Sequence, residues 1–150
     1  MSIIIAIDFD GTLCDHRFPD IGRENPGAFE WLRKFQDAGA RLMLWTMRSD
    51  MISDGVSCEG HPADKPYLTE AVEWCRERGI EFWGVNSNAE QGSWTASPKQ
   101  YAHLYVDDAA ACCPLRENPR AGGRPMLDWS IVGPSVMTQI EIRKAFKVSP

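Results

Sequence analysis

Two carboxylates separated by one residue directly follow an apolar run near the start of the sequence. The run is Ile3–Ile7, and Asp8 and Asp10 come immediately after it. A second acidic pair, Asp107-Asp108, follows the apolar residues 104–106. Carboxylates gathered at one place repel each other, by about 4 kcal/mol for two charges ~4 Å apart at an effective dielectric of ~20. An all-oxygen group of this kind, with no histidine expected nearby, predicts a bound Mg²⁺ rather than zinc.

These residue types indicate phosphoryl transfer. A carboxylate whose charge is partly neutralised by a metal can attack phosphorus and form an aspartyl-phosphate, and Asp8 at a strand end is the expected nucleophile. Asp10 is expected to protonate the leaving oxygen and later to deprotonate the hydrolytic water. Thr46 offers a hydroxyl and adjacent backbone N–H groups to the phosphoryl oxygens, and Lys99 offers a positive charge. Arg48 can contact a substrate phosphate or lie on the surface.

Hydrophobic patterning predicts the elements that position these groups. Uninterrupted apolar runs indicate strands buried on both faces, and apolar residues at helical spacing indicate the helices between them. The expected strands are residues 3–7, 41–46, 80–85, 104–106 and 127–132. The expected helices run from Asn25-Pro26 to Gly39, from Asp64 to Gly79, over a short stretch opened by Ser97-Pro98, and from Ser135 to Phe146.

Alternating strands and helices predict an α/β fold of one domain over residues 1–150. The expected architecture is a three-layer, Rossmann-like parallel sheet with helices on both faces. In such sheets the ligand lies beyond the carboxyl ends of the strands. The residues expected to become neighbours at that edge are Asp8, Asp10, Thr46, Asp107 and Asp108.

The same residues resemble the haloacid dehalogenase (HAD) superfamily of phosphohydrolases and phosphotransferases. That family's first motif, DxDGT after an apolar strand, is similar to residues 8–12. Its second motif, a Thr or Ser at a strand end, is matched by Thr46, and its fourth, an acidic pair, by residues 107–108. Its lysine is best matched by Lys99, which is preferred to Lys65 because it directly precedes the fourth motif's strand.

The resemblance implies a metal site and an open architecture. Magnesium would be held by the side chain of Asp8, the backbone carbonyl of Asp10 and an acid of the fourth motif, with the choice between Asp107 and Asp108 open. The intervals between motifs are too short for a large cap, so a capless member is expected. Capless members accept bulky phosphates or borrow a neighbouring subunit as cover, so the resemblance also allows for a homo-oligomer. Residues 49–64 are either a small lid or a solvated loop.

The leading hypothesis is therefore a Mg²⁺-dependent phosphomonoester phosphatase that acts through an aspartyl-phosphate. Its substrate would be a nucleotide, a nucleic-acid end or a small sugar phosphate. The alternatives are a phosphotransferase of the same family and a non-catalytic HAD-like binding protein. A response-regulator receiver fits less well, because a receiver carries its acidic pair on the first strand and its phosphorylated Asp later.

Composition limits the remaining possibilities. A formal net charge of −5 disfavours a general nucleic-acid binder but not an enzyme that meets a nucleic-acid end. The sequence has five cysteines without a CxxC pair and no secretory leader, which predicts a cytoplasmic protein with reduced thiols. No apolar run approaches 20 residues, so no membrane span is expected. Cys58 and His61 lack a second pair of zinc ligands. The basic stretch with Arg116, Arg120 and Arg124 could receive an anionic substrate, but a solvated loop is the preferred interpretation.

Overall fold

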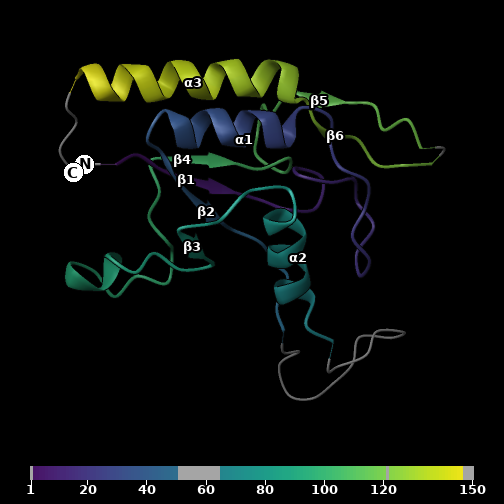
Figure 1. The fold of residues 1–150 in the computed structure, drawn as a ribbon, viewed down its shortest axis with the longest axis horizontal. Helices are drawn as coiled ribbons and strands as arrows, with labels where there is room; N and C mark the ends of the chain where they lie inside the picture. The colour runs from purple at the N-terminus through teal and green to yellow at the C-terminus, as the bar shows by residue number, and fades with distance from the viewer. Residues whose placement is uncertain (1, 51–64, 121, 147–150) are drawn as a thin grey trace.

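The structure is a computed structural model that describes residues 2–50, 65–120 and 122–146. Its centre is a four-stranded parallel sheet in the order β3-β2-β1-β4 (Figure 1). The strands are β1 (Ile4–Ile7), β2 (Arg41–Leu44), β3 (Gly84–Val85) and β4 (Leu104–Val106). The mixed α/β class and the parallel sheet confirm the sequence-based prediction, although β3 is shorter than the run 80–85 suggested.

Strand β1 lies between β2 and β4, and all four of its residues are buried. Its alternate side chains enter two different apolar clusters, Ile5 and Ile7 on one face and Ile4 and Ala6 on the other. Burial on both faces explains why this run shows no polar alternation in the sequence.

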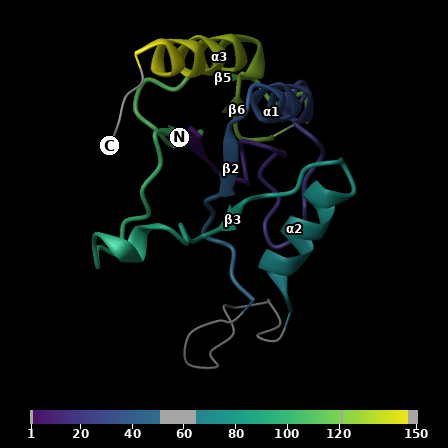
Figure 2. The same ribbon diagram turned by 60° about the vertical axis from the view of Figure 1, so that its left-hand side comes forward.

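The helices of the described chain pack on a single face of the sheet. They are α1 (Ala28–Asp37), α2 (Tyr67–Arg76) and α3 (Trp129–Ala145), and buried residues of each belong to the cluster that contains Ile5 and Ile7. Helix α3 lies over α1, and α2 lies beyond β2 and β3 (Figure 1, Figure 2). Helices on both faces, as the sequence predicted, are thus not seen among the described residues.

Residues 86–103 cover part of the opposite face. They contain a short 3₁₀ helix, Gln91–Ser93, and no α-helix, so the helix expected at Ser97-Pro98 is wrong. This segment carries no apolar stripe at helical spacing, and the Gln91 side chain donates to the carbonyl oxygens of Ser97 (2.8 Å) and Lys99 (3.0 Å) instead. The cluster on this face is correspondingly small: Ile4, Ala6, Met43 and Ala102 are packed against Trp45 and Trp83.

The C-terminal region also differs from the prediction. Instead of a strand over 127–132, β6 (Met126–Leu127) pairs antiparallel with β5 (Leu115–Arg116), and α3 follows at once. Asp128 caps α3 by accepting a hydrogen bond from the Ser130 N–H, so Ser135 lies inside the helix. Trp129, Gly133, Val136 and Ile140 are its buried residues, and their spacing of three and four is helical.

The first two helices begin differently from the prediction. The N-cap of α1 is Gly27 rather than Asn25, whose buried side chain instead donates to the carbonyl oxygens of Thr12 (3.0 Å) and Leu127 (2.7 Å). The start of α2 is held by Asp50, which accepts from the Leu68 and Thr69 N–H groups. The expected cap Asp64, the proposed lid and the Cys58/His61 pair fall outside the described residues. No helix of the described chain is long and apolar enough to cross a bilayer.

The packing of α3 on α1 requires a glycine. A Cβ added at Gly133 would lie 2.3 Å from two ring atoms of Trp31. Gly133→Ala is therefore expected to lower the free energy of unfolding by about 1–3 kcal/mol although alanine favours helix, because the rigid indole must move. Gly92→Ala is the matched control, since a Cβ there meets nothing within 4 Å. Equal urea denaturation midpoints for both variants would contradict this account.

Candidate active site

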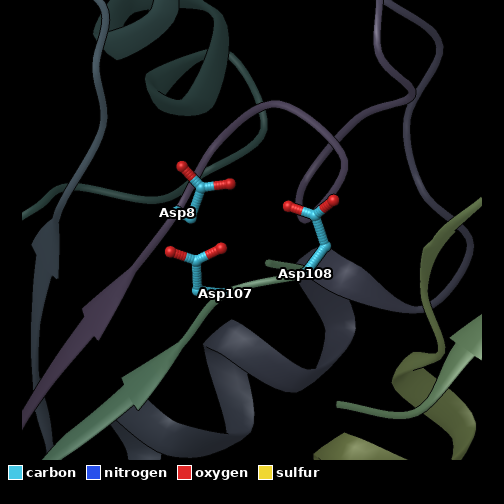
Figure 3. Close-up of side chains that lie close together, drawn as sticks. All are labelled: Asp8, Asp107 and Asp108. Atoms are coloured by element: carbon cyan, nitrogen blue, oxygen red, sulfur yellow. The ribbon is translucent and has the colours of Figure 1, made fainter. Parts of the chain in front are cut away.

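The register of the sheet brings the two acidic motifs together. Ile7 of β1 is paired with Val106 of β4, and the N–H of Asp8 donates to the Val106 carbonyl (2.9 Å). Asp8 and Asp107 therefore leave the ends of neighbouring strands. One carboxylate oxygen from each of Asp8, Asp107 and Asp108 lies within 4.8 Å of the others. Figure 3 shows the three carboxyl groups on the same side of the strand ends.

The electrostatics of this cluster make it a candidate cation site. Burial, and then the charges of Asp107 and Asp108, raise the pKa of Asp8 from 3.8 to about 7. Three oxygen ligands from carboxylates suit a hard divalent ion, which would remove the repulsion among them. The donor set thus fits the predicted Mg²⁺ site, whereas the choice between Asp107 and Asp108 as the stronger ligand stays open.

Thr12 links the two acidic motifs. Its hydroxyl donates to Asp8 Oδ2 (3.1 Å) and accepts from the Asp108 N–H (3.2 Å). The preceding Gly11 has φ +86°, and a Cβ there would lie 2.1 Å from His16 Nε2 and 2.5 Å from Asp108 Oδ2. The Gly-Thr pair of the first motif is therefore required both by backbone conformation and by close approach.

His16 was missed by sequence reasoning, which expected no histidine near the acids. Its Nε2 lies 2.9 Å from Asp108 Oδ2, and both side chains are mostly buried. The position of His16 in the loop directly after the first motif was the sequence feature that could have indicated this contact. The contact leaves Asp108 with one carboxylate oxygen, Oδ1, outside this hydrogen bond.

Asp10 does not join the cluster of the other three acids. Its carboxylate makes two hydrogen bonds to Arg48, from Nε (2.8 Å) and from a terminal nitrogen (2.7 Å). The Arg48 side chain is 1% exposed, lies against the rings of Phe9 and Phe18, and also donates to the carbonyl oxygens of residues 19 and 20. Arg48 is therefore a buried partner of Asp10 and not an exposed phosphate-binding group.

Thr46 follows β2 at the carboxyl edge, as expected. Its hydroxyl oxygen accepts from the Arg48 N–H (3.2 Å), and its own N–H donates to Asn86 Oδ1 (2.8 Å). Asn86 follows β3 and has φ +49°. Sequence reasoning missed this residue, although a polar side chain after a strand was the available signal. The Thr46 O–H has no acceptor among the described residues, whereas the Thr46 and Arg48 N–H groups already donate to Asn86 Oδ1 and Thr46 Oγ1.

Lys99 lies away from the carboxyl edge. Its exposed side chain places Nζ 5.8 Å from the centroid of the Tyr105 ring. Tyr105 lies on the edge strand β4, where it is paired with Ala6, a residue of the cluster on the face opposite the helices. Lys65, the rival lysine, forms an ion pair with Glu70 (3.4 Å). Neither of these lysines is brought to the three carboxylates in this conformation.

Comparisons with known proteins give a family but no activity. No protein-family model and no curated protein matches the chain. A solved structure, that of a conserved protein of Bacteroides thetaiotaomicron, matches it with 34% sequence identity, a TM-score of 0.63 and 93% of each chain covered. The chain belongs to the family of this conserved protein. The description of the Bacteroides thetaiotaomicron protein names no function, so family membership supports the shared fold alone.

The raised pKa of Asp8 predicts how this member of the family responds to pH. Below about pH 4 Asp8 is protonated in both the folded and the unfolded protein, so it costs nothing. Between pH 4 and 7 only the unfolded state loses the proton, and stability falls until the full cost is reached above pH 7. Without divalent metal, Asp8→Asn is therefore expected to stabilise the protein by about 4 kcal/mol at pH 8 and to have little effect at pH 4.

Thermal or urea unfolding in a chelating buffer measures this difference. Asp37→Asn, an exposed residue at the end of α1, is the control and should show no such growth with pH. Added Mg²⁺ should reverse the order, because it stabilises only a protein that binds it. A wild-type protein more stable than Asp8→Asn at pH 8 in chelator would contradict the raised pKa.

The buried ion pair gives a second prediction. Arg48→Met is expected to lower the free energy of unfolding by about 3–5 kcal/mol, because the Asp10 side chain is only 20% exposed and loses its partner. Adding Asp10→Asn should recover part of that loss, since no unpaired charge remains. Arg76→Met, which breaks an exposed pair with Glu73, should change stability little. Denaturant titrations of the single and double variants provide the measurement.

Proposed function

We propose that the protein is a Mg²⁺-dependent phosphomonoester phosphatase of the HAD type. The observation that carries the proposal is the meeting of Asp8, Asp107 and Asp108 within 4.8 Å at the ends of β1 and β4. The link through Thr12 supports it, since the hydroxyl contacts both acidic motifs. The HAD resemblance supplies the reaction, and the carboxylates supply the groups that this reaction needs.

Asp8, Asp107 and Asp108 would hold the metal. When bound, the metal neutralises the carboxylates and polarises the phosphoryl oxygens. The raised pKa of Asp8 is a property of the metal-free site, and binding of a cation favours the ionised carboxylate that can attack. The Thr46 hydroxyl would donate its hydrogen to a phosphoryl oxygen, since its oxygen already accepts from the Arg48 N–H.

The proposed reaction has two displacements at phosphorus. A carboxylate oxygen of Asp8 forms a bond to phosphorus, the ester P–O bond breaks, and Asp10 gives a proton to the leaving oxygen. A water then attacks phosphorus while Asp10 takes its proton, the aspartyl-phosphate bond breaks, and inorganic phosphate leaves. Arg48 fixes the Asp10 carboxylate through two hydrogen bonds. The proton that Asp10 gives and takes back would therefore sit at a position on the carboxylate oxygens that these two hydrogen bonds leave free.

A metal-binding protein without turnover is the second candidate. Two observations favour it. The carboxylate of Asp10 is engaged by Arg48, and Lys99 lies beside Tyr105 rather than beside Asp8. If substrate binding brings neither a free Asp10 oxygen nor a cation to the site, the acids would bind Mg²⁺ without catalysis.

Hydrolysis of p-nitrophenyl phosphate distinguishes these candidates. The wild type is expected to release p-nitrophenol and inorganic phosphate with Mg²⁺, and to lose this activity in a chelator. Asp8→Asn is expected to reduce kcat by at least about 10³-fold because the nucleophile is lost. Steady release of phosphate without an added acceptor would favour a phosphatase over a phosphotransferase.

Asp37→Asn is the matched control for that experiment, since it makes the same chemical change at an exposed site on α1. Its kcat should equal that of the wild type. Mg²⁺ binding by calorimetry without any turnover would support the non-catalytic candidate. Equal activity in the wild type and Asp8→Asn would refute the proposed mechanism.

A further inference from the structure

The antiparallel pair β5 and β6 forms a hairpin beside the acidic cluster. This hairpin, residues 115–127 without the undescribed residue 121, extends outward past the carboxyl ends of β1 and β4 (Figure 1). From the sequence, a solvated loop is the preferred interpretation of this stretch over a binding site for an anionic substrate, and the proposed chemistry at Asp8 does not use it. Its position at the rim of the site gives a reason to reconsider its charges.

Both ends of the hairpin are joined to the candidate active site. The strand β5 begins seven residues after Asp108, and the Leu127 N–H of β6 donates to the carbonyl oxygen of Gly11 (2.8 Å). Trp129, directly after the hairpin, donates from Nε1 to the carbonyl oxygen of Thr12 (2.8 Å). The base of the hairpin is thus hydrogen-bonded to the Gly-Thr pair that contacts Asp8 and Asp108.

The hairpin is basic in an acidic protein. It carries three arginines (Arg116, Arg120 and Arg124) against one acid, Glu117, whereas the whole chain has a formal net charge of −5. Arg120 is used internally, since its terminal nitrogen lies 3.2 Å from Asp15 Oδ2 and ties the hairpin to the loop after β1. This ion pair holds the hairpin against the part of the chain that carries Thr12 and His16.

Two of the arginines have no ionic partner in the described part of the chain. Arg124 is exposed and Arg116 is partly exposed, and neither forms an ion pair with a described acid. Arginine suits phosphate because its planar guanidinium donates two parallel hydrogen bonds to phosphate oxygens. Basic side chains outside an acidic reaction centre are suited to phosphates other than the one that reacts.

We propose that this hairpin binds the phosphodiester backbone of a single-stranded oligonucleotide whose terminal phosphate reacts at Asp8. The inference rests on the proposed phosphatase function and names its substrate class. A monophosphorylated sugar has one phosphate group, which the metal and Thr46 would contact. Such a substrate has no further phosphate for the arginines of the hairpin to bind. A nucleic-acid strand carries further phosphates at regular spacing, and these would lie along Arg116 and Arg124.

The kinetic test compares substrates of one chemistry and different length. These are p-nitrophenyl phosphate, thymidine monophosphate, and a six-nucleotide oligothymidylate with a terminal phosphate, prepared with the phosphate at either end. In the wild type, KM for the hexamer should be at least tenfold below KM for the mononucleotide. In the double variant Arg116→Gln, Arg124→Gln, the ratio of the two KM values should approach one.

Salt dependence gives an independent readout. Each arginine–phosphate contact contributes about 0.7 to the slope of log K against log salt for single strands. Binding of a fluorescent phosphorylated hexamer to Asp8→Asn, measured by anisotropy, should therefore lose about 1.4 of that slope when both arginines are replaced. Arg33→Gln, an exposed arginine on α1, is the control and should leave the slope and the hydrolysis rates unchanged.

The outcomes separate this inference from the proposed function. Absence of hydrolysis of every substrate would refute the proposed phosphatase function. Arginine-dependent binding of the hexamer would, even then, support oligonucleotide binding by the hairpin. Hydrolysis of p-nitrophenyl phosphate with equal KM for mononucleotide and hexamer, and a slope unaffected by the double variant, would overturn the oligonucleotide inference and leave the phosphatase standing. An unchanged circular dichroism spectrum and melting temperature of the double variant establish that it folds.

Discussion

The repulsion among Asp8, Asp107 and Asp108 is the constraint that the surrounding structure must satisfy. Their carboxylate oxygens lie within 4.8 Å of one another, and burial adds to the cost of ionising Asp8. A fold keeps such an arrangement only where the backbone is held firmly, because relaxation of either strand end would separate the charges. The parallel pairing of β1 with β4 provides this restraint, and the Asp8 N–H is itself part of that pairing.

The loop after β1 provides the second restraint. Its Gly11 and Thr12 carbonyl oxygens accept hydrogen bonds from Leu127 and Trp129, and the Thr12 oxygen also accepts from Asn25. The N-terminal motif, the start of α1 and the start of α3 are therefore joined at one place. The hydrogen bonds explain why the hairpin before α3 stands beside the acidic cluster, which is the placement that the oligonucleotide inference depends on.

The Arg48–Asp10 pair is a contact that sequence reasoning did not foresee. The family resemblance implied a metal contact from the Asp10 backbone carbonyl, and Arg48 was expected either to contact a substrate phosphate or to lie on the surface. In the structure Asp10 turns to a buried guanidinium that also holds the carbonyl oxygens of residues 19 and 20. Arg48 thus joins the loop after β1 to the loop after β2, and its burial removes it from contact with a phosphate while the loops keep this arrangement.

The order and spacing of residues determined the parallel α/β class, the central buried strand and the meeting of Asp8 with Asp107 and Asp108. Those features follow from local apolar runs and from the rule that parallel strands end at the same edge. Tertiary structure alone decided the pairing of Asp10 with Arg48, the contact of His16 with Asp108, the position of Lys99 and the packing of all described helices on one face. Each of these depends on which side chains fill the space between distant segments, and residue spacing along the chain carries no measure of that space.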